Sequence, residues 1–236
     1  YMKETDYLMN ETEIMYRQTD IWKIFRYNAF TLSQKNMWNY GGTPFSNNAS
    51  LRWQSMTMNR YEWDVKETFA WNWLDSRLLR GGPDVRFGSY FLTSAKFNTD
   101  KAKRMMFMLK YEGDHNFEGN RFNTISPSLT FRLGNHVYLS GQLDYAWNTD
   151  EMQYVATTSP LSSSSLTPYY YVMGHMDQKT YGLTLKLQVN VTPDISIQFY
   201  GAPFTSIAKY DDFKLAADTK SHTFENRFQR IDPDHL

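Results

Sequence analysis

Hydrophobic and polar residues alternate most regularly between residues 181 and 200. A strand with one apolar and one polar face produces such a period of two residues. Thr192-Pro193-Asp194 then provides a tight reversal, because proline fixes φ and aspartate bonds its own nearby backbone. The alternation resumes afterwards, so this segment predicts a β-hairpin. Its apolar positions are Tyr181, Leu183, Leu185, Leu187, Val189, Val191, Ile195, Ile197 and Phe199.

The first arm of this hairpin is longer than a soluble strand requires. Soluble strands usually run about 5–6 residues, whereas a tilted strand that crosses a membrane needs roughly 9–11. The alternation here persists without error for the eleven residues 181–191. The polar parity carries Lys186, Gln188 and Asn190, which suit the wet lumen of a barrel. The pattern therefore favours a transmembrane barrel over a soluble sandwich.

Less regular alternation predicts strands along the rest of the chain. We expect them at residues 6–17, 21–32, 35–40, 51–58, 61–73, 85–97, 105–111, 129–133 and 137–155, followed by the hairpin, whose first arm begins at 169. The connections at residues 41–48, 76–84, 112–123 and 157–168 are long, whereas those around Asn59, Thr99, Gly134 and Pro193 are short. Outer-membrane barrels have this asymmetry of short periplasmic turns and longer extracellular loops. The sequence predicts an all-β fold, a transmembrane antiparallel up-and-down β-barrel of about 12 or more strands.

Composition agrees with a barrel. Aromatic residues make up 17% of the chain, while its mean hydropathy is −0.62. An apolar exterior with aromatic girdles around a polar interior gives this combination. The 25 basic and 25 acidic residues cancel, so nothing suggests nucleic acid or another polyanion as a partner. The absence of cysteine excludes disulfides and cysteine-based zinc sites.

The chain carries no visible targeting or helical membrane segment. No run approaches the roughly 18 apolar residues of a transmembrane helix, and a closed barrel does not need one, because its strands satisfy one another's backbone groups. No export signal is visible at Tyr1. We therefore expect residues 1–236 to form a single barrel domain within a longer precursor whose signal lies upstream.

Several segments resemble one protein family. They are LLRGGP at 78–83, FNTDK at 97–101, QYV at 153–155, the run from DQKTYGLTLKLQVNV to TPDISIQFYGAPF, and YDDFK at 210–214. The chain resembles the C-terminal barrel domain of Gram-negative outer-membrane proteins in a domain-of-unknown-function family, often preceded by a carbohydrate-binding-module family 9-like domain. The sugar-binding-like domain, the last strands and the terminal aromatic residue of that pattern are not in this sequence, which leaves open whether the barrel is complete in this chain.

The resemblance implies location and partners but no chemistry. It places the protein in the bacterial outer membrane, in contact with lipid and lipopolysaccharide, with other outer-membrane or surface proteins as partners. Through its neighbouring domain it also implies glycan handling or uptake, which is an argument by association alone. It supplies no catalytic residue to transfer.

The predicted lumen is the candidate site. Arg132, Gln142, Asp144, Lys186 and Gln188 occupy the polar parity, where opposed charges either set ion selectivity or neutralise one another in a packed interior. Small barrels are filled by side chains, whereas larger barrels enclose a channel or a plugged lumen. For a barrel of about 12 strands, both an open and a plugged lumen fit the sequence. In the loop at 76–84, Arg80 beside two glycines could contact lipopolysaccharide phosphate. The simpler reading is that the glycines shape a tight loop and Arg80 is solvated.

Enzymatic and metal sites lack a signature. The 5 histidines are widely spaced, and no pair stands at metal-ligand spacing. The adjacent Asp211 and Asp212 lack the remaining ligands of a calcium site. A Ser/His/carboxylate arrangement could form between distant strands, but no nucleophile elbow supports it. We expect no catalytic residue, no metal and no cofactor.

Four functions fit these observations. The leading hypothesis is an outer-membrane β-barrel that serves as membrane anchor or pore for a surface or periplasmic module that handles glycans. The alternatives are a non-specific or selective porin, a barrel-embedded hydrolase, and a soluble β-rich binding protein.

Overall fold

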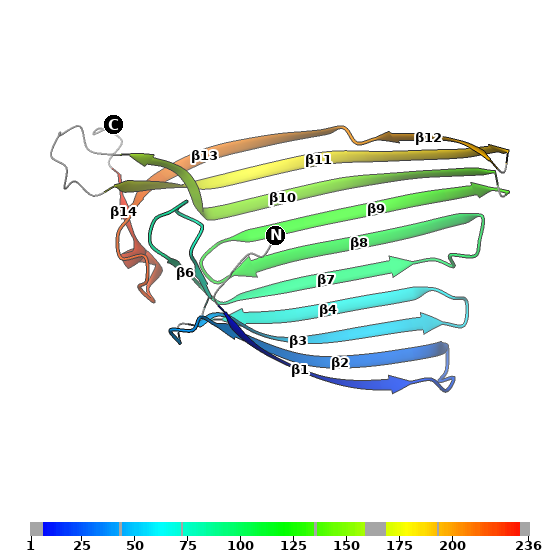
Figure 1. Ribbon diagram of the computed structural model, residues 1–236, viewed down its shortest axis with the longest axis horizontal. Coiled ribbons are helices and arrows are strands. Elements are labelled where there is room, and N and C mark those ends of the chain that lie inside the picture. The colour runs from blue at the N-terminus through cyan, green and yellow to red at the C-terminus, as the bar shows by residue number, and fades with distance from the viewer. Residues whose placement is uncertain are drawn as a thin grey trace.

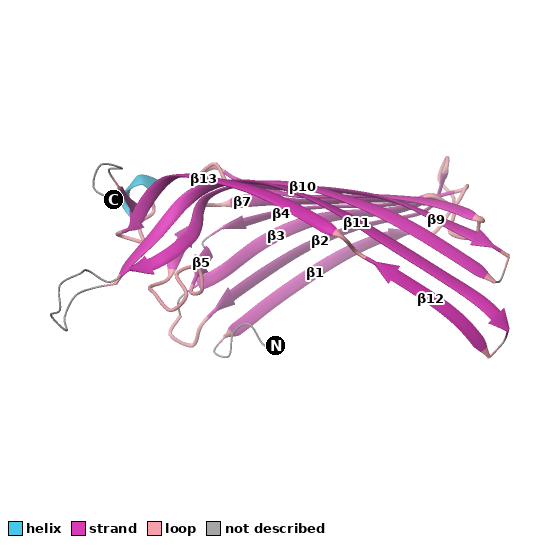
Figure 2. Ribbon diagram, turned by 90° about the horizontal axis from the view of Figure 1, so that it is seen from above, coloured by secondary structure: helices cyan, strands magenta, loops and turns pink. Residues whose placement is uncertain are grey.

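The protein is built almost entirely of antiparallel strands. The computed structural model describes residues 7–42, 44–71, 73–134, 136–158, 169–192 and 194–231. These form a 12-stranded sheet in the order β1-β2-β3-β4-β7-β8-β9-β10-β11-β13-β14, with β12 also paired to β11, so most strands lie beside their neighbours in sequence (Figure 1). The predicted all-β, up-and-down antiparallel architecture is confirmed. The sheet curves strongly, but its edges do not meet, so the described strands do not close into a barrel (Figure 2).

The strands differ greatly in length. Those of the large sheet are β1 (Leu8–Gln18), β2 (Phe25–Trp38), β3 (Pro44–Thr57), β4 (Glu62–Trp71), β7 (Tyr90–Asn98), β8 (Met105–Asn116), β9 (Arg121–Leu133), β10 (Val137–Thr158), β11 (Tyr170–Thr192), β12 (Ile195–Gly201), β13 (Phe204–Ala216) and β14 (Phe228–Arg230). A separate hairpin consists of β5 (Trp73–Asp75) and β6 (Val85–Phe87), and η1 (Phe224–Arg227) is one 3₁₀ turn. No helix in the described ranges is long and apolar enough to cross a membrane.

Several predicted boundaries are wrong for a common reason. The expected strand at 35–40 is the end of β2, which runs unbroken to Trp38. The expected loops at 41–48 and 112–123 are mostly strand, since β3 begins at Pro44 and only residues 117–120 separate β8 from β9. In these stretches polar residues occupy both faces while backbone pairing continues, as between Gln34 and Ala49. Hydrophobic alternation therefore stops before the strands do.

The expected strand at 85–97 is interrupted by a change of partner. β6 ends at Phe87 and β7 begins at Tyr90. Between them the Gly88 N–H donates to the Glu118 carboxylate at 3.0 Å, outside any strand ladder. This contact with the β8–β9 turn lets β6 leave the large sheet and pair with β5.

Cross-strand register divides the sheet into two chemically different faces. Directly paired residues share a face, and one such row crosses from β1 to β11 through apolar residues. It comprises Tyr16, Phe30, Trp53, Val65, Ala95, Tyr111, Ile125, Tyr145 and Tyr181. One residue further along β3, a row on the other face contains Gln54, Asp64, Lys96, Lys110 and Ser126. The predicted apolar and polar parities are thus continuous surfaces, which we call the apolar face and the polar face.

The apolar face is exposed rather than covered. The exposed fractions of Ile14, Leu143 and Ile207 are 67%, 58% and 68%. Hollows form instead over the polar face, for example beside Lys66, Thr68 and Ser94, which places this face on the inner side of the curve. This arrangement is the reverse of a soluble fold, whose apolar residues face inward.

A small hydrophobic core lies between the loop at 76–84, β6, β10 and β11. These segments meet at the end of the sheet where Figure 1 labels β6 and β14. Leu79, Val85, Met152 and Met173 are each no more than 1% exposed and pack together. The predicted loop at 76–84 folds back between β5 and β6 and supplies Leu79 to this core. Residues 159–168 of the predicted loop at 157–168 lie outside the described residues, as do Pro193, Asn135 and His235.

Candidate functional site

All the predicted lumen residues lie in strands with the expected parity, but the structure divides them. The first group is formed on β9 and β10. Asp144 Oδ1 accepts hydrogen bonds from Ser126 Oγ at 2.5 Å and from Gln142 Nε2 at 2.8 Å. Ser126 is 5% exposed, so the carboxylate lies at a largely covered part of the polar face. These two neutral donors hold Asp144 in place.

The second group surrounds a hollow near the tight-turn end. Arg132 and Gln188 line this cavity of about 360 Å³ with His136 and Tyr138. Arg132 Nη1 donates to the Lys101 backbone oxygen at 3.2 Å. Gln188 Nε2 donates to Asn190 Oδ1 at 3.1 Å. The side chains are therefore tied to their own surroundings, and the hollow joins β9, β10 and β11.

Lys186 stands apart from both groups. It is paired with Ser140 on one side and Tyr200 of β12 on the other. Its Nζ lies 5.7 Å from the centre of the Tyr200 ring, a cation–π distance. Like Gln188, which is paired with Gln198, it lies beside β12, where the sheet ends.

A further ion pair on the polar face was not predicted. Arg52 Nε donates to Asp64 Oδ1 at 2.7 Å, and Gln54 Nε2 donates to Asp64 Oδ2 at 3.2 Å. All three residues lie across the β3–β4 hairpin, where Gln54 and Asp64 are directly paired. The polar parity of both strands and the short connection near Asn59 indicated a hairpin with these residues on one face. Only the register of the hairpin shows that Arg52 and Asp64 lie close enough to pair.

The loop candidate Arg80 lies against an aromatic ring. Its guanidinium carbon is 4.6 Å from the centre of the Tyr154 ring, and its φ is +49°. The backbone of nearby Gly82 passes close to the side chain of Tyr171. A Cβ added at Gly82 would lie 2.6 Å from the Tyr171 ring. The glycine does permit a tight loop, as expected, and Arg80 covers the small core as well as meeting solvent.

Arg227 ties three separate parts of the chain together beside this core. It is 1% exposed, and its guanidinium bonds both carboxylate oxygens of Glu118, at 2.6 and 3.0 Å. It also donates to the backbone oxygens of Arg86 at 2.6 Å and Ser221 at 2.8 Å. The C-terminal segment is thereby attached to β6 and to the β8–β9 turn. Nothing local in the sequence marked this residue.

A charged cluster lies where β10 and β11 extend past the apolar residues. His175 Nδ1 is 2.9 Å from Glu151 Oε1, and its Nε2 is 3.4 Å from Asp177 Oδ2. Burial opposes protonation, but the hydrogen bonds to Asp177 and Glu151 outweigh it and raise the pKa of His175 above its usual value. Burial also lowers the pKa of the nearby Lys214, which is 4% exposed, against the attraction of Asp212 and Glu151.

This cluster is not a metal site. Within the described ranges, no group of three or more His, Cys, Asp or Glu side chains could hold a metal ion. The His175 cluster instead links β10 to β11 and, through Lys214 Nζ at 3.9 Å from Glu151 Oε2, to β13.

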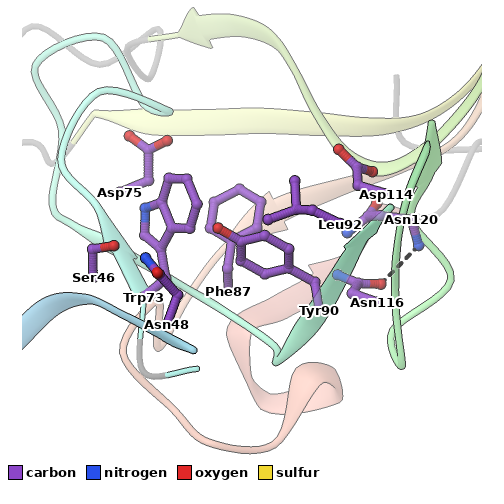
Figure 3. Close-up of a pocket in the computed structure, with 10 residues that line it drawn as sticks. All are labelled: Ser46, Asn48, Trp73, Asp75, Phe87, Tyr90, Leu92, Asp114, Asn116 and Asn120. Atoms are coloured by element: carbon purple, nitrogen blue, oxygen red, sulfur yellow. Dashed lines mark hydrogen bonds between the residues drawn. The ribbon is translucent and has the colours of Figure 1, made fainter. Parts of the chain in front are cut away.

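A hollow with an aromatic wall lies on the polar face at the long-connection end (Figure 3). Its volume is about 550 Å³. The Trp73 ring lies 5.2 Å from the Tyr90 ring and 6.1 Å from the Phe87 ring, centre to centre. Asp75 and Asp114 face the same space, and the remaining polar lining residues are Ser46, Asn48, Asn116 and Asn120 (Figure 3). We call this the aromatic pocket.

The aromatic pocket was missed because its residues come from distant parts of the sequence. β3 supplies Ser46 and Asn48, β5 supplies Trp73 and Asp75, and β8 supplies Asp114. The expected strand at 61–73 would place Trp73 in the large sheet. Trp73 lies instead in β5, which pairs with β6 outside the large sheet, and its side chain lines the pocket.

These features define a class and a family. The fold is an antiparallel β-meander with an exposed apolar face and a polar inner face. The small core and the Arg227–Glu118 contacts cover one end of the sheet, which we call the capped end. The model of the family described as "Domain of unknown function (DUF5916)" matches residues 1–234, and the chain belongs to this family. The expected membership of a domain-of-unknown-function family is confirmed. The search of curated proteins and the search of solved structures each found no match.

Proposed function

We propose that this protein is a transmembrane β-barrel domain of the bacterial outer membrane, serving as a membrane anchor or pore. The observation that carries the proposal is the continuous exposed apolar face. Soluble monomers rarely expose contiguous apolar patches beyond a few hundred Å². The row from Tyr16 to Tyr181 alone crosses β1 to β11, and lipid is the surrounding that would satisfy such a surface.

The height of the apolar face fits a bilayer. On β10 the outward positions are apolar or glycine from Val137 to Trp147 and become polar at Thr149. On β11 the matching band runs from Tyr181 to Val191, and Lys179 follows it. Each band has eleven residues, in line with the roughly 9–11 residues of a membrane-crossing strand.

Membrane insertion also requires closure. Hydrocarbon offers no hydrogen-bond partners, so an open sheet edge does not persist there. Within the described sheet, β1 has a strand partner only in β2, and β12 only in β11. In the proposed membrane form these edges pair with each other or with further strands.

The polar face supports the pore version of this function. It carries Arg52, Asp64, Lys96, Lys110 and Lys186, and charged lumen residues tune ion selectivity in barrels. In planar bilayers, Lys186→Glu should shift the preference of a pore toward cations. Unchanged selectivity would remove Lys186 from the channel lining, and no conductance at all would favour the anchor role.

The family resemblance adds a context to this proposal. It suggests lipopolysaccharide and other surface proteins as neighbours, and glycan handling by an associated module. Neither hydrolase chemistry nor a soluble binding role gains support from the polar-face geometry.

Adjacent residues on opposite faces test the membrane proposal. Leu143 belongs to the apolar face and is 58% exposed, whereas Gln142 belongs to the polar face. In lipid, Leu143→Arg should cost about 2–4 kcal/mol near the midplane and reduce assembly of a form that migrates faster in gels before boiling. Gln142→Arg should assemble normally. In water an exposed Leu143 would tolerate arginine, so equal behaviour of the variants would overturn the proposal.

A further inference from the structure

The aromatic pocket has the chemistry of a ligand site. Its volume of about 550 Å³ falls in the range of about 300–1,000 Å³ that small-molecule sites occupy. One wall is formed by the rings of Trp73, Phe87 and Tyr90, and the others are mostly polar (Figure 3). Apolar walls with a few convergent polar groups are typical of binding pockets.

Asn120 is fixed in place where it lines this region. Asn120 Oδ1 accepts a hydrogen bond from the Glu151 N–H at 2.6 Å, which fixes the orientation of the amide. Its Nδ2 is buried, with no accessible surface for a ligand oxygen to approach. The Asn120 side chain therefore shapes the wall of the pocket.

Hydrogen bonds from backbone N–H groups fix the side chains of Asn116 and Asp75, which also line the pocket. Asn116 Oδ1 accepts from the N–H groups of Glu118 at 3.0 Å and Asn120 at 2.9 Å. Asp75 Oδ1 accepts from the Arg77 N–H at 2.7 Å. The same side chains line the pocket, so their positions do not depend on a ligand.

The lining selects against charged ligands. It contains the carboxyl groups of Asp75 and Asp114 but no lysine, arginine or histidine, which disfavours an anion. A simple cation would suit the carboxylates and rings but offers no acceptor to the amides of Asn48 and Asn116, which also line the pocket. A ligand with both hydroxyl donors and oxygen acceptors, and with an apolar face for the rings, satisfies every group.

We propose that the aromatic pocket binds a neutral saccharide, stacked by its C–H face on Trp73 and hydrogen-bonded through its hydroxyl groups to Asp114 and Asn116. Aromatic rings supply apolar contact area with little rotamer entropy to lose. The inference goes beyond membrane insertion and does not rest on it, since the pocket is formed within the chain.

Calorimetric titration of the whole chain tests this proposal. The protein is kept in an amine-oxide detergent, because detergents with sugar head groups would compete. The neutral probes are pentasaccharides of maltose, cellulose, xylan, laminarin, mannan and chitin type. Choline serves as the cationic probe and oligogalacturonate as the anionic probe. Saturable binding of at least one neutral probe is the expected result.

Substitutions then locate the binding. Trp73→Ala should abolish it, whereas Trp73→Phe should retain it with weakened affinity, since a smaller ring remains. Asn116→Asp keeps the acceptor for the Glu118 and Asn120 N–H groups but removes the amide donor, and it should weaken binding about tenfold, the effect of losing one hydrogen bond. Trp22→Ala is the matched control, because Trp22 is exposed and lies in the β1–β2 connection at the opposite end.

The outcomes decide between ligand classes. Binding of choline or oligogalacturonate alone would overturn the saccharide proposal, and so would neutral binding that Trp73→Ala leaves unchanged. Absence of binding by any neutral probe to a folded protein would also overturn it. Unaltered circular dichroism of Trp73→Phe and Asn116→Asp shows that a loss of binding is not a loss of fold.

Discussion

Arg227 and Glu118 form a bidentate ion pair across 109 residues of sequence, with contacts of 2.6 and 3.0 Å. The pair is covered, since the side chains are 1% and 12% exposed. Breaking a buried pair from one side typically costs about 3–5 kcal/mol, because an uncompensated charge remains. This contact therefore controls whether the C-terminal segment stays attached to the capped end.

Removing the cation should release the C-terminal segment. We expect Arg227→Ala to lower the free energy of local unfolding by about 3–5 kcal/mol, seen as faster proteolysis after Ala216 and loss of amide protection at Arg86. Arg230→Ala is the control, because the Arg230 side chain is 84% exposed. Equal proteolysis of the two variants would contradict the assigned role.

Truncation in the small core should be costly, in contrast to truncation on the apolar face. Leu79→Ala opens a cavity among Val85, Met152 and Met173 and should lower stability by about 2–5 kcal/mol. Leu133→Ala changes a side chain that is 63% exposed and should cost far less in detergent. The melting temperatures of the two variants are compared with that of the parent protein. A decrease for Leu133→Ala as large as that for Leu79→Ala would contradict the assignment of Leu79 to the core and Leu133 to the exposed face.

The close approach at Gly82 predicts intolerance of a single methyl group. An alanine Cβ would lie 2.6 Å from the Tyr171 ring and 2.7 Å from Leu79 Cβ, so Gly82→Ala should displace the loop and weaken the small core. At Gly141 the nearest atom would be 3.5 Å away, and Gly141→Ala should be tolerated. Comparable melting temperatures for the two variants would argue against the tight loop.

The histidine cluster predicts a pH-dependent contact between β10 and β11. The folded-state pKa of His175 is raised above 6.5, so its contribution is present below that value and is lost as pH rises through the folded pKa. The effect should stay below about 1 kcal/mol, as for partly exposed pairs. Thermal stability measured from about pH 5 to 8.5 should fall less in His175→Gln than in the parent, with His222→Gln as the control.

Much of the fold follows from local pattern, and the remainder does not. The alternation of Leu185 with Lys186 needs only the period of a strand, so the two faces were predictable. The ends of β2 and β8 were not, because polar residues such as Gln34 and Asp114 continue the ladder beyond the apolar band. Edge closure was also beyond local reasoning, since it depends on how strand tilt accumulates across the sheet.

The candidate sites divide in the same way. Parity alone placed Gln142 and Asp144 on one surface, and the structure joins them with Ser126. The aromatic pocket and the Arg227–Glu118 pair join residues far apart in sequence, and neither has a short motif. These residues become neighbours only when the chain folds, so composition and motif spacing could not predict either site.

The alternation that builds the apolar face also conceals it until folding. Apolar and polar residues alternate along residues 181–191, so the extended segment has no continuous apolar run. The apolar face forms only when neighbouring strands pair and bring every second side chain to one side. The exposed apolar surface is therefore a property of the assembled sheet and not of any single segment.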